Sequence, residues 1–167
     1  MRDEVDELTE AWARERPDLD LGALAVFSRI SRLARHLDLA RREAFTTHAI
    51  ESWEFDVLAA LRRAGAPYEL TPGRLLRATL VTSGTMTNRV DRLADRGFVE
   101  RHPDPGDRRG VIVRLTREGK AAVDGAFTAL IEAERSLLAE LPAGEQKQLA
   151  SLLRRLLLPF TDPPPSG

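Results

Sequence analysis

Apolar side chains recur at intervals of three and four along most of the chain. Five segments show this spacing: residues 1–15, 21–45, 48–63, 117–140 and 143–158. Such spacing places apolar side chains on one face of a helix, so each segment predicts an amphipathic helix packed against a core. Pro17, Gly65 and Pro142 separate these helices, because proline and glycine interrupt the helical hydrogen-bond pattern.

The middle of the chain carries a different pattern, which begins with two shorter helices. They are predicted over residues 72–79 and 83–96. Thr71-Pro72 marks the first start, because a hydroxyl caps the first turn and proline suits the first helical position. Thr82 or Ser83 caps the second helix, and Gly97 stops it.

Two short β-type runs follow the second helix. They cover residues 98–102 and 111–115, and a loop of turn-forming and basic residues at 103–109 joins them. Thr116 then caps a long helix. Two helices followed by a hairpin with a basic tip is the order of a winged helix-turn-helix. The sequence therefore predicts a mainly α fold with a small β-hairpin wing.

The second short helix separates into an apolar face and a polar face. The apolar face carries Met86, Val90, Leu93 and Gly97. The polar side and the helix start carry Ser83, Thr85, Thr87, Asn88 and Arg92. Such side chains hydrogen-bond to base edges and phosphates, and the major groove admits one helix. An ordinary solvated helix face has the same pattern, but the adjoining basic hairpin favours DNA binding.

Composition indicates an ordinary soluble globular protein. Of the 167 residues, 43% are hydrophobic and 31% charged, and cysteine is absent, which excludes disulfides and thiolate metal ligands. The acidic start is unlike a signal peptide, and no apolar run is long enough for a membrane span, so we expect a cytoplasmic protein.

Motifs of catalysis are missing from the sequence. We find no glycine-rich phosphate loop and no nucleophile elbow, and the three histidines lack metal-ligand spacing. We therefore expect no catalytic residue, no cofactor and no metal. We also expect that the protein is not an enzyme.

Charge is distributed unevenly. The net charge is −1, but residues 71–120 hold eleven basic and six acidic side chains, so this segment is +5 and the remainder −6. A basic middle between acidic ends suggests a local polyanion-binding surface. A solvated helical face is the alternative when charge alone is considered.

Two contiguous stretches resemble a known family. Residues 87–101, TNRVDRLADRGFVER, and 104–116, DPGDRRGVIVRLT, resemble the recognition helix and wing of the MarR (multiple antibiotic resistance regulator) family. The resemblance implies that Arg109 enters the minor groove while Asp107 holds it in position. A narrow minor groove attracts arginine, and Arg108 is an alternative because the two arginines are adjacent.

The same resemblance implies a domain organisation and partners. Residues 1–47 would form N-terminal helices of a dimerisation region with a possible ligand site, and 48–116 the DNA-binding lobe. Residues 117–160 would complete the dimerisation region, and 161–167 would be a disordered tail. The leucine-rich last helix fits this division. A homodimer would then bind a pseudo-palindromic double-stranded DNA operator, as a repressor.

A possible ligand site rests on resemblance to one subgroup of the family. Trp12, Asp56 and Arg89 resemble the pattern of members that respond to urate and related anions. We expect Arg89 to pair with Asp56 near Trp12 or Trp53, with Arg101 as a second cation. A small organic anion, either a urate-like purine or a polycarboxylate, would then release the DNA.

Other interpretations of these residues remain open. Trp12 can be a core anchor and Asp56–Arg89 a static ion pair. Family effector pockets between the first two long helices make Arg32, His36 and His48 alternative anion contacts. Two other functions compete with the main one: a winged-helix protein-interaction module without DNA binding, and a regulator without a small-molecule effector.

Overall fold

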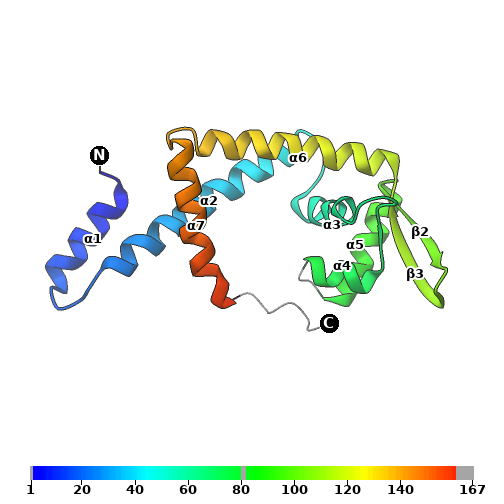
Figure 1. Ribbon diagram of the computed structural model, residues 1–167, viewed down its shortest axis with the longest axis horizontal. Coiled ribbons are helices and arrows are strands. Elements are labelled where there is room, and N and C mark those ends of the chain that lie inside the picture. The colour runs from blue at the N-terminus through cyan, green and yellow to red at the C-terminus, as the bar shows by residue number, and fades with distance from the viewer. Residues whose placement is uncertain (1, 80–81, 161–167) are drawn as a thin grey trace.

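The computed structural model describes residues 2–79 and 82–160, and only the backbone at 108 and 109. Its elements are α1 (Glu4–Glu15), α2 (Gly22–Thr46), α3 (Ser52–Arg63), β1 (Glu69–Leu70), α4 (Pro72–Thr79), α5 (Ser83–Asp95), β2 (Val99–Asp104), β3 (Asp107–Leu115), α6 (Arg117–Leu137), α7 (Ala143–Leu157) and the 3-10 helix η1 (Leu158–Phe160). The predicted mainly helical fold with a hairpin wing is confirmed (Figure 1).

Helices α3, α4 and α5 and a three-stranded antiparallel sheet form one lobe, with strand order β1-β3-β2. Strand β1 was not predicted, because a segment of two residues is too short to show the alternation of a strand. Glu69 pairs with Arg114 across β1 and β3, and the Arg114 Nε donates to Glu69 Oε2 at 2.9 Å. This side-chain bond fastens β1 to the wing.

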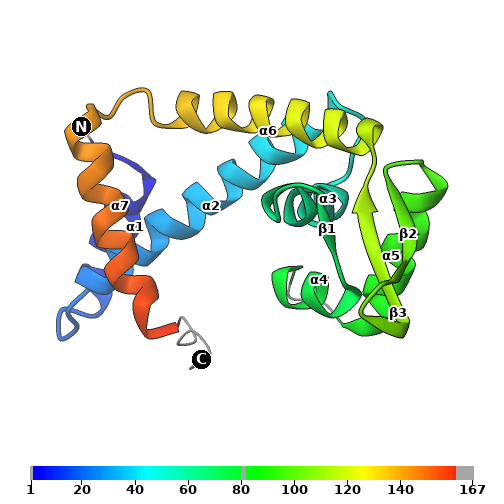
Figure 2. The same ribbon diagram turned by 45° about the vertical axis from the view of Figure 1, so that its right-hand side comes forward.

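Strands β2 and β3 form the wing, which projects from the lobe (Figure 2). Both are longer than predicted, because residues of the expected loop pair across the hairpin as far as Asp104 and Asp107. A Cβ at Gly110 would lie 2.8 Å from the Asp104 Cβ. Glycine at this position lets the two strands approach closely at the tip.

Helix α3 begins four residues later than predicted. The segment before it turns at Ala49, whose φ of 53° is uncommon for a residue with a side chain. The start is fixed where Glu54 Oε2 accepts a hydrogen bond from the Glu51 N–H at 2.8 Å. The predicted end is confirmed, since Gly65 has a φ of 79° after the last turn.

Helices α2 and α6 are the long supports of the fold and lie against each other. Thr116 caps α6 as predicted, because its Oγ1 accepts from the Gly119 N–H at 3.0 Å. The same hydroxyl donates to the Gly97 carbonyl at 2.8 Å. A Cβ at Gly119 would lie 2.1 Å from the Phe98 carbonyl oxygen, so glycine allows α6 to begin directly against the wing.

The buried core lies in the lobe and where α2 and α6 cross it. Phe45 and Phe55 stack there with ring centroids 4.3 Å apart. In contrast, α1, the N-terminal half of α2 and α7 extend away from the lobe (Figure 1). No side chain of α7 is buried in the protomer. Within residues 2–79 and 82–160, no helix has both the length and the apolar character of a membrane span.

Candidate nucleic-acid interface

Helix α5 presents one face to the core and the other to solvent. Met86, Val90 and Leu93 are buried, as predicted, whereas Gly97 is exposed because it follows the helix. The predicted polar set is exposed throughout: Ser83, Thr85, Thr87, Asn88 and Arg92. Packing of the apolar face therefore fixes which side chains of α5 point outward.

Local hydrogen bonds define both ends of α5. At the start, the Thr82 and Thr85 hydroxyls lie 2.9 Å apart, and Thr87 donates to the Ser83 carbonyl at 3.2 Å. At the end, Gly97 adopts a φ of 71°, and the Phe98 N–H donates to the Leu93 carbonyl at 2.9 Å. This αL termination turns the chain directly into β2, so α5 and the wing are held in a fixed relation.

Arginines of α5 contact the start of α3. The guanidinium groups of Arg92 and Arg89 lie 4.7 and 5.5 Å from the centroid of the Trp53 ring. Trp53 Nε1 donates to Glu51 Oε2 at 2.6 Å, and Arg92 Nη2 donates to Glu51 Oε1 at 3.3 Å. We call Glu51, Trp53 and Arg92 the α3 clamp. The sequence pattern named Trp53 as a neighbour of Arg89 but gave no sign of Glu51, because the contact of Glu51 with Arg92 spans 41 residues.

Arg96 makes a second, deeper connection between the end of α5 and α3. Its Nη1 donates to Glu54 Oε2, and its Nη2 donates to the Ala49 carbonyl at 2.6 Å. Glu54 is 1% exposed, so its charge needs this partner. Arg96 thereby also holds the turn that precedes α3.

The wing tip is described only in part. Asp107 begins β3 opposite Asp104, but the side chains of Arg108 and Arg109 lie outside the described residues. Their expected roles, and that of Asp107, stay predictions. Arg101 on β2 pairs with Asp91 of α5 at 2.7 Å, which ties the wing to the polar side of the helix.

The expected pairing of Arg89 with Asp56 is wrong for the described protomer. Arg89 lies over Trp53 instead, and the Asp56 carboxylate faces Arg41 Nη2 at 3.8 Å. Trp12 is 48% exposed on α1, which packs on α2 at the far end from α3 (Figure 1). Trp12, Asp56 and Arg89 are therefore not brought together within one protomer, and Trp12 is not a core anchor.

The alternative anion contacts are also dispersed. Arg32 Nε donates to Glu4 of α1 at 2.6 Å. His36 is exposed, whereas His48 is half-buried against α6, where a Cβ at Gly125 would lie 2.7 Å from its Cε1. Among the residues described, no three histidine or acidic side chains gather as a metal site.

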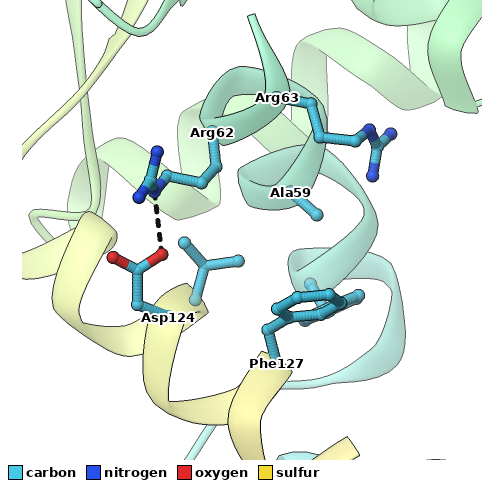
Figure 3. Close-up of a pocket in the computed structure, with 7 residues that line it drawn as sticks. Ala59, Arg62, Arg63, Asp124 and Phe127 are labelled. Atoms are coloured by element: carbon cyan, nitrogen blue, oxygen red, sulfur yellow. Dashed lines mark hydrogen bonds and ion pairs between the residues drawn. The ribbon is translucent and has the colours of Figure 1, made fainter. Parts of the chain in front are cut away.

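Two cavities lie beside α3, and neither was predicted, since each combines helices distant in sequence. The first, about 330 Å³, lies between α3 and α6 (Figure 3). Its lining comprises Phe55, Ala59, Arg62, Arg63, Val123, Asp124 and Phe127. Arg62 Nε donates to Asp124 at 2.8 Å, and this bond raises the pKa of Arg62. The lining therefore combines four apolar residues with Arg63 and the Arg62–Asp124 pair.

The second cavity, about 470 Å³, lies between the end of α2 and the start of α3. Its lining comprises Arg42, Phe45, Thr46, Ile50, Glu51, Ser52 and Trp53. Because Glu51 and Trp53 belong to both the cavity and the α3 clamp, this cavity directly adjoins the arginines of α5.

Comparisons with known proteins agree with this fold. Residues 50–110 match the sequence profile described as MarR family. The chain is 37% identical to the HTH-type transcriptional regulator PecS of Dickeya dadantii, over 92% of each chain. Its fold resembles that of a mutant MarR from E. coli complexed with operator DNA, with TM-score 0.67 and 31% identity over 87% of this chain and 97% of that one.

A further structural relative is Bordetella bronchiseptica BpsR, whose DNA binding is regulated by 6-hydroxynicotinic acid. The TM-score is 0.59 and the identity 26%, over 77% of this chain and 98% of that one.

Proposed function

Because this chain belongs to the MarR family of DNA-binding transcriptional regulators, and is not an enzyme, we propose that it binds a pseudo-palindromic operator as a homodimer. We further propose that it acts as a repressor and that a small organic anion releases it. The proposal of DNA binding rests chiefly on the exposed polar face of α5. Gly97 and Thr116 hold this face beside the wing.

Dimerisation is supported by apolar side chains that the protomer leaves in solvent. Helix α7 exposes Leu152, Leu153, Leu156 and Leu157, and α2 exposes Phe27 and Leu33. Exposed apolar surface on this scale marks an interface. We assign residues 1–47 and 117–160 to the dimer and 48–116 to the DNA-binding lobe. Twofold symmetry then places the two α5 helices about 34–36 Å apart, one turn of DNA.

The proposed DNA contacts divide between the two grooves. The exposed α5 side chains, Ser83, Thr85, Thr87, Asn88 and Arg92, would enter the major groove. The wing would place Arg109, or Arg108, in the minor groove, with Asp107 as its support. A protein-interaction module would instead need an acidic or apolar face on α5, and from Ser83 to Arg92 the exposed side chains of that face are polar or basic.

Release by an anion is proposed at the start of α3. The second cavity is lined by Trp53, and the Arg89 guanidinium lies over the ring of that residue. A urate-like purine or polycarboxylate bound in the cavity would attract Arg89 or Arg42 by its negative charge. Asp56 lies on the next turn of α3. Trp12 joins such a site only if the dimer brings α1 of the second protomer to it. A bound anion shifts the equilibrium between the DNA-binding and the released arrangement of the dimer. The shift is set by the difference in the anion's affinity for these two arrangements.

DNA binding is tested by titrating the protein into labelled DNA from upstream of its own gene. We expect sequence-selective binding that weakens steeply with salt, because phosphate contacts release counterions. Addition of urate or citrate should release the DNA. Equal affinity for the upstream and a scrambled duplex would contradict the proposal. Selective binding that neither anion alters would contradict the effector part alone.

A further inference from the structure

We infer that Glu51 determines specificity by restraining Arg92, so that this arginine strengthens binding to the operator more than binding to unrelated DNA. The inference rests on the proposed function, because it assumes that Arg92 faces the groove. Glu51 lies at the start of α3 and is not itself a base-reading residue. Its role is that of a positioning residue acting through Arg92.

The contacts of the α3 clamp restrain the guanidinium from two directions. The Trp53 ring lies 4.7 Å from it on one side, and Glu51 Oε1 accepts its hydrogen bond at 3.3 Å. Trp53 Nε1 holds the other oxygen of Glu51 at 2.6 Å, so the carboxylate is oriented as well. These contacts favour one position of Arg92 among those open to an unrestrained arginine.

The carboxylate also changes the charge that Arg92 offers to DNA. The Arg92 and Glu51 side chains are 61% and 60% exposed, so the pair is weak and can be broken. On unrelated DNA a charged phosphate gains less from Arg92, because Glu51 neutralises part of the guanidinium charge, whereas a neutral base edge depends less on that charge. On the operator, a base edge can accept from the guanidinium N–H groups that Glu51 leaves available, without breaking the pair. Glu51 therefore weakens a contact between Arg92 and a phosphate more than a contact between Arg92 and a base edge.

A substitution that removes the charge at nearly constant size tests this effect. Glu51→Gln loses the charge and replaces one of the two acceptor oxygens by an NH2 donor, so the side chain can no longer accept from both Trp53 Nε1 and Arg92 Nη2. Glu10→Gln is the matched control, because Glu10 is also an exposed partner of an arginine, Arg2, but lies on α1. Arg92→Ala and the double variant Glu51→Gln/Arg92→Ala complete the set.

The experiment measures the dissociation constants of each dimer for a footprinted operator and for a scrambled duplex of equal length, over a range of salt. We expect Glu51→Gln to bind the scrambled duplex roughly 2- to 5-fold more tightly, as loss of an exposed ion pair permits. For the scrambled duplex, the slope of log binding constant against log salt concentration should become steeper by about 0.9 for each subunit that gains a phosphate contact. Operator affinity should change less, so the selectivity ratio falls. Glu10→Gln should leave the affinity for the scrambled duplex, its salt dependence and the selectivity ratio unchanged.

The double variant separates restraint of Arg92 from general repulsion between Glu51 and DNA. With Arg92 absent, Glu51→Gln should no longer tighten scrambled binding. Tightening that persists in the Arg92→Ala background overturns the inference, as does an unchanged selectivity ratio in Glu51→Gln. Parent protein that fails to prefer the operator would instead refute the proposed function itself, so the two failures are distinguishable.

Discussion

Replacing Arg96 by alanine should destabilise the protein more than any loss of an exposed ion pair. The Glu54 carboxylate is 1% exposed and accepts from Arg96 and from the Glu51 N–H. Removing one partner of a buried pair costs about 3–5 kcal/mol. Because the Arg96 side chain is 36% exposed, water replaces part of the loss, and we expect about 2–3 kcal/mol.

The assay is thermal unfolding at a fixed protein concentration, since the melting temperature of a dimer depends on concentration. A loss of this size should lower Tm by about 4–12 °C for a chain of this length. Arg101→Ala is the control, because Arg101 and Asp91 are 42% and 49% exposed and their pair is worth about 1 kcal/mol or less.

A second variant distinguishes an unpaired charge from lost packing. In Arg96→Ala/Glu54→Gln the buried group is neutral, so part of the lost stability should return. The reasoning is refuted if Arg96→Ala lowers Tm no more than Arg101→Ala does. It is also refuted if the second substitution lowers Tm further.

Three further outcomes are expected. Arg109→Ala should weaken operator binding more than Arg117→Ala in the same titration, because only the wing tip is expected to enter the minor groove; equal losses would refute the wing assignment. Asp56→Asn should make release by urate or citrate occur at lower anion concentration, because it removes a negative charge one turn of α3 from the proposed anion site, while leaving ligand-free DNA affinity nearly unchanged; an unaltered response places the site elsewhere. Hydrogen bonds from Arg29 lower the pKa of Asp3, so this contact stabilises α1 above about pH 4 and is lost as pH falls through the lowered pKa. The difference in unfolding free energy between the parent and Asp3→Asn should therefore shrink on acidification, and a constant difference would contradict it.

Sequence reasoning succeeded where the determinants are local. Pro72 begins α4, Gly97 ends α5 and Thr116 caps α6, because each acts on backbone within a few residues. The start of α3 was predicted wrongly. Ala49 turns the chain there with a positive φ, and alanine seldom adopts this conformation, so the residue type does not predict the turn.

The candidate site was predictable only along α5 itself. Helical spacing identified its exposed residues, but the partners of its arginines come from α3, through contacts that no periodicity encodes. The expected Arg89–Asp56 pair failed for this reason. Trp53 packs beneath Arg89, and Arg41 from α2 faces Asp56.

The central claim, a dimer that reads an operator with α5 and its wing, is tested most directly by hydroxyl-radical footprinting on the upstream DNA. We predict two protected regions related by a pseudo-dyad, with centres about 10 base pairs apart, as two recognition helices in successive major grooves require. A single protected region, or protection that does not depend on sequence, would contradict the account.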